Sequence, residues 1–199
     1  MQQERPKETC TTNLSPQREY ERVAKDEYSY IHEHLTTLYF IVSEFKTKRI
    51  LEIGTGNGHS TLAMAEAAKP IGGHVTTIDI EECKSAKDLI FSKDLGEIVT
   101  FIKSDSLKIG YESSLDLVFI DGAHTYAQVM AELKKYAWLV NIGGFIILHD
   151  IANPAHPDVW EAINDWFLNA ETCTQFQWYR YFNCNGLLIL RRHDPNEIL

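Results

Sequence analysis

A strand-like apolar run passes through a glycine-rich turn into the start of a helix in the segment Arg49-Ile50-Leu51-Glu52-Ile53-Gly54-Thr55-Gly56-Asn57-Gly58-His59-Ser60-Thr61. Glycine lets the backbone bend tightly and approach a ligand closely, and the N-terminus of the following helix offers N–H groups to that ligand. A second apolar run ends at Asp79, where a carboxylate is placed to accept hydrogen bonds from ribose hydroxyls. The segment therefore predicts a crevice for a nucleotide-type cofactor.

The spacing of the glycines separates two classes of cofactor. The dinucleotide fingerprint G-x-G-x-x-G needs a third glycine where this chain has His59. The chain has G-x-G-x-G instead, with Glu52 two residues before the first glycine. This pattern, with Asp79 downstream, resembles the first two motifs of the class I S-adenosylmethionine (SAM) methyltransferases. The resemblance favours SAM over NAD, and an NAD-dependent oxidoreductase remains the alternative.

The composition indicates one globular domain. The chain has 199 residues, a formal net charge of −9 and a pI near 5.3, which argues against a general nucleic-acid binder. We expect one domain over 1–199, with a flexible tail over 1–14 and a helical cap over 15–46. The sequence shows neither a membrane-length apolar run nor a signal-peptide pattern, and its cysteines lack C-x-x-C spacing. We therefore expect unpaired thiols and a cytoplasmic location.

Strands and helices alternate after the cap, which is itself predicted as one long or broken amphipathic helix over 16–46. The expected strands are 49–53, 74–79, 98–102, 115–120 and 144–149, and the expected helices are 59–69, 82–94, 126–140 and 158–169. Two further strands, 175–182 and 187–191, flank the turn signal Asn183-Cys184-Asn185-Gly186. The pattern predicts an α/β fold: a Rossmann-like, doubly wound, mostly parallel seven-stranded sheet that ends in an antiparallel hairpin. Such a hairpin is characteristic of class I methyltransferases and is a second argument for SAM.

Two later segments make the resemblance more specific. They are Val118-Phe119-Ile120-Asp121-Gly122-Ala123-His124-Thr125-Tyr126 and Gly143-Gly144-Phe145-Ile146-Ile147-Leu148-His149-Asp150. They resemble the I-D-G-x-H-x-Y and G-G-x-x-x-x-H-D motifs of a branch of the small O-methyltransferases, which is related to the catechol and caffeoyl-CoA O-methyltransferases. The resemblance runs from about Arg49 to Asp150 and implies methylation of a hydroxyl on a small-molecule acceptor.

The same resemblance implies the residues that contact SAM. The implied contacts are Glu52, Gly54, Thr55, Gly56, Gly58, Ser60, Asp79, Ile80, Asp105, Ser106 and Asp121. Ser60 is assigned to the methionine carboxylate and Asp79 to the ribose, whereas Asp105 and Ser106 flank the adenine. Two of these assignments have a structural alternative, because serine is common at helix starts and Asp105 fits an ordinary solvated loop.

A divalent metal is implied by the relatives that methylate catechols, with Mg²⁺ or Mn²⁺ as the candidates. Asp121 and Asp150 match two of the three ligand positions in those relatives, and carboxylates suit hard cations. The third position departs from the pattern, because Ile151 replaces an asparagine there. Asn153 or His149 could substitute, and an imidazole ligand would favour manganese, iron or zinc over magnesium. The presence of a metal is left open by the sequence.

His124 occupies the place of a lysine general base in the catechol enzymes, and His149 is the second candidate. A helix-capping role for His124 is the alternative. Trp160 and Trp166 are candidates for the substrate pocket, and Tyr126 either closes the pocket or packs. Three rivals to an O-methyltransferase remain: the oxidoreductase, a degenerate SAM-binding module acting through a partner, and hydroxylase-like chemistry. The cap helix fits either a lid or a homodimer interface.

Overall fold

The computed structural model describes residues 31–168 and 173–194. The predicted tail and the first half of the predicted cap therefore lie outside the described residues. The rest of the cap is the short 3-10 helix η1 (His32–His34) followed by α2 (Leu35–Phe45). Among the described residues, no helix combines the length and the apolar character needed to cross a membrane.

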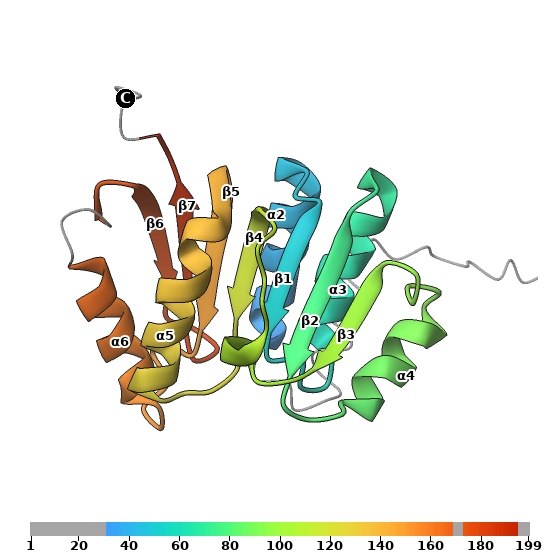
Figure 1. Ribbon diagram of the computed structural model, residues 1–199, viewed down its shortest axis with the longest axis horizontal. Helices are drawn as coiled ribbons and strands as arrows, with labels where there is room; N and C mark the ends of the chain where they lie inside the picture. Colours follow the sequence, from blue (N-terminus) through green and yellow to red (C-terminus); the bar gives the residue numbers. More distant parts are fainter. Residues whose placement is uncertain (1–30, 169–172, 195–199) are drawn as a thin grey trace, which may run out of the picture.

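The centre of the fold is a seven-stranded sheet (Figure 1) with the order β3-β2-β1-β4-β5-β7-β6. The strands are β1 (Arg49–Ile53), β2 (His74–Asp79), β3 (Val99–Lys103), β4 (Leu115–Ile120), β5 (Val140–His149), β6 (Phe176–Tyr181) and β7 (Leu187–Arg192). The first five strands pair in parallel, whereas β7 runs antiparallel to both β5 and β6. The predicted fold class is therefore confirmed, including the terminal hairpin.

The two faces of the sheet carry separate hydrophobic cores. The remaining helices are α3 (His59–Ala68), α4 (Lys84–Ser92), α5 (Tyr126–Tyr136) and α6 (Pro157–Phe167). Side chains of α2, α3 and α4 join one core, and those of α5 and α6 join the other. Because the central strands are covered on both faces, they are buried along most of their length, which explains their continuous apolar sequences.

Short 3-10 helices account for small differences at the predicted boundaries. They are η2 (Lys69–Ile71), η3 (Ser106–Lys108) and η4 (Ala137–Leu139). The predicted helix 126–140 ends at Tyr136 and continues as η4, and η3 lies in the predicted loop after β3.

The prediction for β5 was wrong at its start, because the strand begins at Val140 and not at residue 144. The pairing with β4 shifts register between Leu115 and Leu117, and Gly143 has a φ of +85°. A glycine with positive φ accommodates such an irregularity inside a strand. The sequence pair Gly143-Gly144 therefore marks a distortion within β5 and not its beginning.

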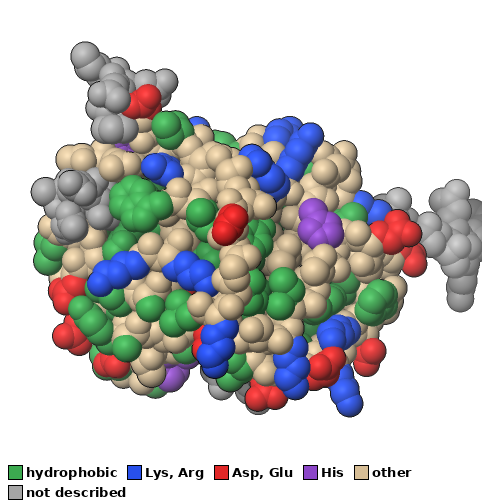
Figure 2. All heavy atoms as spheres, in the orientation of Figure 1, with side chains coloured by type: hydrophobic (Ala, Val, Ile, Leu, Met, Phe, Trp, Pro, Cys, Tyr) green, Lys and Arg blue, Asp and Glu red, His purple; other side chains and the backbone are tan. Residues whose placement is uncertain are grey.

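On the face seen in Figure 2, basic side chains lie among hydrophobic and acidic ones. The expectation that the chain is not a nucleic-acid binder stays a prediction. The single domain over 1–199, the homodimer, the lid and the cytoplasmic location also stay predictions.

Candidate functional site

The carboxyl ends of the parallel strands meet at one edge of the sheet, and the four acids at or just after these ends lie there. Asp79 ends β2, Asp105 follows β3, Asp121 follows β4 and Asp150 follows β5. Ligands of open α/β sheets bind at this edge.

Two pockets open along the edge. The larger, with a volume of about 510 Å³, is lined by Ile53, Gly54, Gly56, Ile78, Asp79, Ile80, Glu81, Ser104, Asp105, Ser106, Asp121, Gly122, Ala123, Gln128 and Glu132. The smaller, of about 230 Å³, is lined by Ile31, Gly54, Thr55, Gly56, Asn57, Gly58, His59, Ser60, Asp121, His124, His149 and Asp150. Because Gly54, Gly56 and Asp121 line both, the pockets are adjoining parts of one crevice.

The glycine loop forms the boundary between the pockets. Gly54 has a φ of +95°, and a Cβ at this position would lie 2.1 Å from the backbone oxygen of Asp121. A side chain is thus excluded both by the backbone conformation and by a rigid neighbour. Gly58 has a φ of +83°, and a Cβ there would lie 2.7 Å from the Cβ of Ala86 in α4. These two glycines let the loop pass closely by the end of β4 and by α4.

Asp79 holds the glycine loop in place. Its Oδ2 accepts hydrogen bonds from the backbone N–H groups of Thr55 and Gly56 at 2.9 and 3.1 Å, and its Oδ1 accepts from Glu81 N–H at 2.9 Å. Burial opposes ionisation of Asp79, but these hydrogen bonds prevail and lower its pKa. The Cys83 thiol also donates to this carboxylate, and because a thiol is a weak donor, a ligand hydroxyl can take its place.

Glu52, whose contact with SAM stays a prediction, lies beneath the glycine loop. It is fully buried in β1 and lines neither pocket of the crevice. Its carboxyl group accepts hydrogen bonds from the hydroxyls of Ser60, at 2.6 Å, and Thr61. Burial raises the pKa of Glu52 to about 7. Glu52 therefore positions the first turn of α3 from beneath the loop.

Ser60 lines the smaller pocket, but its hydroxyl donates a hydrogen bond to Glu52. In this arrangement the hydroxyl does not offer the predicted hydrogen bond to a bound carboxylate. The N–H groups in the first turn of a helix have no partner within the helix. An anion at this end of α3 would therefore be bound by backbone N–H groups.

Among the lining residues of the larger pocket that were not predicted from the sequence, two polar ones come from α5. Glu132 and Gln128, both from α5, line the pocket together with Asp105 and Ser106. Glu132 is 1% exposed, and its Oε1 accepts hydrogen bonds from Ser106 Oγ and Gln128 Nε2. Among the described residues its Oε2 has no hydrogen-bond partner, and burial raises its pKa. A sequence signal existed, because helical spacing places Glu132 on the buried face of α5 with Val129.

The smaller pocket contains a cluster formed by Asp121, His124 and Asp150, which we term the acid–histidine cluster. One potential ligand atom from each of the three lies within 4.8 Å of the others. His124 Nε2 is 2.7 Å from Asp150 Oδ2, at ion-pair distance but outside hydrogen-bonding geometry, and 3.9 Å from Asp121 Oδ1. His156, which was not predicted, stacks on the His124 ring with a centroid separation of 4.2 Å.

Asp150 is held in an unusual backbone conformation. Its φ is +59°, a region that Asp tolerates better than most residues with a side chain. Asn153 Nδ2 donates to Asp150 Oδ1 at 2.8 Å, while Asn153 Oδ1 accepts from Ala155 N–H at 3.0 Å. Asn153 therefore orients Asp150, and its oxygen is already engaged. This arrangement argues against Asn153 as the substitute metal ligand.

His149 is buried beside the cluster, with both ring nitrogens near acceptors. Nδ1 lies 3.2 Å from Asp121 Oδ1, and Nε2 lies 2.9 Å from the backbone oxygen of Cys184. Burial alone would lower the pKa of His149, but the contacts with Asp121 and Asp150 prevail and raise it to about 10. His149 is therefore an imidazolium at neutral pH, which makes it a poor general base.

The charges of the acid–histidine cluster support one another. The contacts with Asp121 and Asp150 outweigh burial and raise the pKa of His124 to about 9. Burial opposes ionisation of Asp150, but His124, His149 and Asn153 prevail and lower its pKa well below the ordinary range. At neutral pH His124 therefore carries a proton on Nε2, close to both carboxylates.

Two of the aromatic candidates lie outside the crevice. The Tyr126 hydroxyl donates a hydrogen bond to Asp165 Oδ2 at 3.0 Å, so Tyr126 links α5 to α6. Trp166 is buried in the core beside Phe176.

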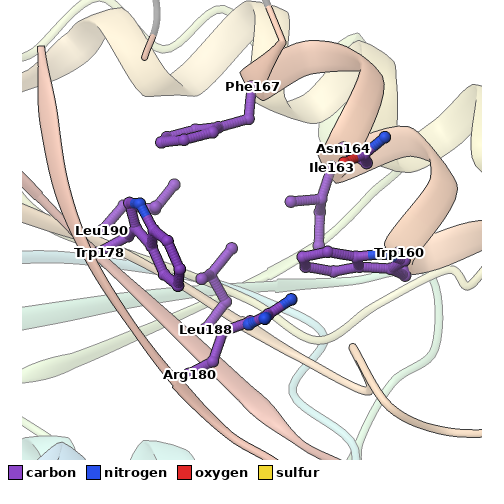
Figure 3. Close-up of a pocket in the computed structure, with 8 residues that line it drawn as sticks. All are labelled: Trp160, Ile163, Asn164, Phe167, Trp178, Arg180, Leu188 and Leu190. Carbon is purple, nitrogen blue, oxygen red and sulfur yellow. The ribbon is translucent and has the colours of Figure 1, made fainter. Parts of the chain in front are cut away.

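Trp160 lines a separate pocket between α6 and the hairpin (Figure 3), with a volume of about 220 Å³. Its lining consists of Trp160, Ile163, Asn164, Phe167, Trp178, Arg180, Leu188 and Leu190. None of these residues lines the two pockets at the carboxyl edge. Trp160 is therefore not part of the crevice that holds the acid–histidine cluster.

The part of the chain that forms the crevice matches a known protein family. Residues 51–151 match the family described as "Methyltransferase domain". The chain belongs to this family. The match covers the glycine loop, Asp79 and the acid–histidine cluster. It confirms the methyltransferase family that the sequence motifs predicted.

A curated relative of this methyltransferase domain lies among the O-methyltransferases. The chain is 30% identical over 120 residues to a caffeoyl-CoA O-methyltransferase of Stellaria longipes. The aligned part covers 55% of this chain and 48% of the relative, so the chain spans about half the length of that protein.

Solved structures share the fold of this methyltransferase domain. The O-methyltransferase from Bacillus cereus in complex with S-adenosylhomocysteine (SAH) is 18% identical with a TM-score of 0.68, over 92% of this chain and 93% of that one. The O-methyltransferase TomG from Streptomyces achromogenes, involved in tomaymycin synthesis and in complex with SAM, is 17% identical with a TM-score of 0.66, over 82% and 81%. At these identities the likeness establishes the fold.

Proposed function

We propose that the protein is a SAM-dependent methyltransferase that methylates a hydroxyl group of a small-molecule acceptor. The observation that carries this proposal is the continuity of the crevice. The larger pocket and the smaller pocket share Gly54, Gly56 and Asp121. A ligand that begins in the larger pocket and passes the glycine loop therefore brings its far end to the acid–histidine cluster.

The adenosine part of SAM fits the larger pocket. Asp79 can accept a ribose hydroxyl in place of the Cys83 thiol, while its three backbone hydrogen bonds keep the loop in position. In the same pocket, Glu132 Oε2 offers an unused acceptor for the exocyclic amine of adenine. The methionine part then lies against Gly54 and Gly56, with its carboxylate near the N-terminus of α3.

The acceptor lies in the smaller pocket, beside the acid–histidine cluster. In the reaction the acceptor oxygen attacks the methyl carbon of the sulfonium, the carbon–sulfur bond breaks, SAH leaves, and the hydroxyl proton is released. Most of the rate advantage of such a transfer comes from holding the two reactants in line. Asp121 and Asp150 provide acceptors that orient the hydroxyl group. His124 as the base stays a prediction, and this role requires that it first lose the proton on Nε2.

The acid–histidine cluster also suits a divalent cation. Two carboxylates and one imidazole favour manganese, iron or zinc over magnesium. Ile151 is 6% exposed and belongs to the hydrophobic core, so it provides no ligand at the position that is asparagine in the catechol enzymes. His124 would supply the third donor atom through Nε2 instead, and a metal-bound His124 would then not serve as the base. A bound ion would lower the pKa of an acceptor hydroxyl and polarise it.

The proposal predicts methyl transfer to a phenolic, catechol-type or other small-molecule hydroxyl. The purified protein is incubated with SAM and a panel of catechols, hydroxycinnamoyl esters and sugars, with and without Mn²⁺, and the intact masses of the acceptors are measured. We expect a mass increase of one methyl group in at least one acceptor, which Asp121→Asn abolishes. SAH binding with no methylated product from any acceptor would instead favour a SAM-binding module that acts through a partner.

A further inference from the structure

A pocket between α6 and the β6–β7 hairpin lies apart from the crevice at the carboxyl edge of the sheet (Figure 3). Its volume is about 220 Å³. Three of its lining side chains are aromatic (Trp160, Phe167 and Trp178), and Arg180 is the one charged side chain among the described residues that line it. We term it the aromatic–arginine pocket and propose that it binds a small planar aromatic carboxylate.

The two walls of the pocket arise from regular spacing along the chain. Four lining residues at helical spacing share one face of α6: Trp160, Ile163, Asn164 and Phe167. On the hairpin, Trp178 lies directly opposite Leu190. Two residues further along β6, Arg180 lies opposite Leu188. Because alternate residues of a strand project from the same side of the sheet, these side chains of the hairpin face α6 together.

The interior of the aromatic–arginine pocket suits a flat apolar group. Ile163, Leu188 and Leu190 are buried and form its aliphatic lining. The three aromatic rings lie around an open centre in Figure 3, where they can stack on a ligand ring or meet its edge. Pockets for drug-sized ligands have volumes of about 300–1,000 Å³, so a pocket of about 220 Å³ suits a ligand of one or two rings.

Arg180 supplies the charge that a carboxylate requires. Its Cζ lies 4.8 Å from the ring centroid of Trp160, 5.3 Å from that of Trp178 and 5.0 Å from that of Phe182. These cation–π contacts hold the guanidinium at the pocket, but no described residue provides it with a carboxylate or carbonyl partner. A planar guanidinium can donate two parallel hydrogen bonds to a carboxylate. The unpaired guanidinium therefore selects an anionic ligand.

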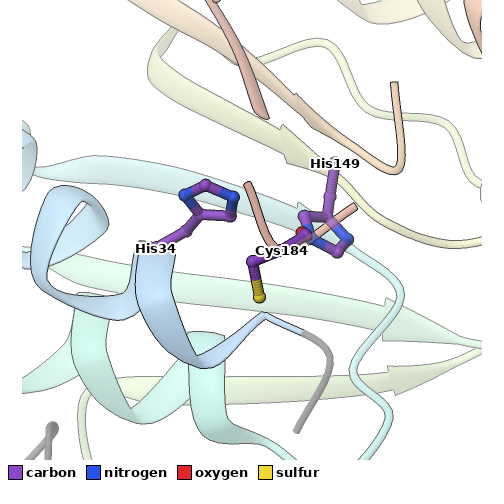
Figure 4. A group of neighbouring side chains, drawn as sticks. All are labelled: His34, His149 and Cys184. Carbon is purple, nitrogen blue, oxygen red and sulfur yellow. The ribbon is translucent and has the colours of Figure 1, made fainter. Parts of the chain in front are cut away.

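The hairpin wall of the pocket is held in place at its turn. His34 Nε2 lies 3.0 Å from the backbone oxygen of Asn183, and His149 Nε2 lies 2.9 Å from that of Cys184. Both buried imidazoles, which Figure 4 shows beside Cys184, therefore donate hydrogen bonds to the turn. A wall that is fixed before the ligand arrives lowers the cost of binding, because less of the protein has to be ordered.

NMR titration of the isotope-labelled full chain with 2-naphthoate tests the site directly, because this planar carboxylate has no hydroxyl group to be methylated. The chain has four tryptophans, of which two line the pocket. We expect the indole N–H signals of Trp160 and Trp178 to shift more than those of Trp138 and Trp166, which do not line it. The expected Kd is about 100 μM, as befits a ligand of this size.

The contribution of the charge is tested with a neutral ligand and with matched variants. The neutral 2-naphthamide should bind at least about tenfold more weakly than 2-naphthoate. Arg180→Met keeps an apolar side chain and should weaken 2-naphthoate binding by at least about tenfold, whereas Arg180→Lys should retain part of the affinity. Arg191→Met is the matched control, since Arg191 lies over Phe45 and Phe145 and does not line the pocket. It should leave the Kd unchanged.

A last variant separates this pocket from the crevice. His124→Ala alters the acid–histidine cluster, which lies in a different pocket, so it should bind 2-naphthoate as tightly as the wild type. The proposal is overturned if 2-naphthoate leaves the Trp160 and Trp178 signals of the folded protein unmoved, or if the amide binds as tightly as the carboxylate. Equal losses of affinity in Arg180→Met and Arg191→Met, or loss of binding in His124→Ala, would also overturn it.

Discussion

The buried carboxyl group of Glu52 leads to a quantitative prediction about stability. Glu52 lies beneath the glycine loop and accepts hydrogen bonds from Ser60 and Thr61. Replacement by glutamine preserves the shape of the protonated carboxyl group: the amide oxygen accepts from one of the two hydroxyls, and the amide N–H donates to the other, as the O–H of the protonated carboxyl group does. Glu52→Gln therefore retains the packing but removes the titration.

The sign of the pH effect follows from the direction of the pKa shift. Burial raises the pKa of Glu52 from 4.5 to about 7, so the native state binds this proton more tightly than the unfolded chain does. The contribution to stability is fully present below pH 4.5 and is lost as the pH rises through about 7. A change of this size corresponds to about 3 kcal/mol. Relative to Glu52→Gln, the wild-type protein should lose about that much stability between pH 4.5 and pH 8.

The assay is urea unfolding of both proteins at about pH 5, 6, 7 and 8, with the exposed Glu97→Gln variant as the control for loss of a negative charge. Subtracting the two unfolding free energies cancels the titration of groups that both proteins share. In thermal unfolding the same change corresponds to a relative shift of about 6–12 °C for a chain of this size. A free-energy difference between wild type and Glu52→Gln that stays constant across this pH range would refute the reasoning.

Two further predictions concern the crevice. Gly54→Ala forces a Cβ against the Asp121 backbone, so it should lower the unfolding free energy by about 3 kcal/mol or more, whereas Gly110→Ala, which has open space, should change it by less than about 1 kcal/mol. Chemical denaturation checks both, and equal effects would contradict the packing argument. His124→Ala should lower kcat by about 10²–10⁴-fold with little change in the Kd of SAH, because its side chain lies at the acceptor end of the crevice. Steady-state kinetics and calorimetry measure the two quantities, and an equal loss of both would place His124 in cofactor binding.

The fold was predictable because its signals are local. The glycine loop, the alternation of strands and helices, and the turn over 183–186 each depend on a few neighbouring residues. The predicted start of β5, at residue 144, was four residues late, because glycine inside a strand weakens the strand signal. The role of Gly143 and Gly144 depends on the register shift against β4, which involves residues much earlier in the sequence.

The site was predictable in outline and less so in detail. The acids at the strand ends identified the edge of the sheet that carries the crevice, since parallel strands place their carboxyl ends together. The burial of Glu52 and its hydrogen bonds with Ser60 and Thr61 could not be predicted, because they arise only when α3 packs over β1. The placement of Cys184 beside His149 could not be predicted from spacing, because it depends on the antiparallel pairing of β5 with β7.

Binding of SAM through Asp79 is central to the proposed function, and calorimetric titration with SAH tests it most directly. We expect micromolar binding to the wild-type protein and no binding of NAD. Asp79→Asn should weaken SAH binding by about 10–100-fold, since it removes a charged hydrogen-bond acceptor. Failure of the folded protein to bind SAH, or tighter binding of NAD than of SAH, would contradict a SAM site in this crevice.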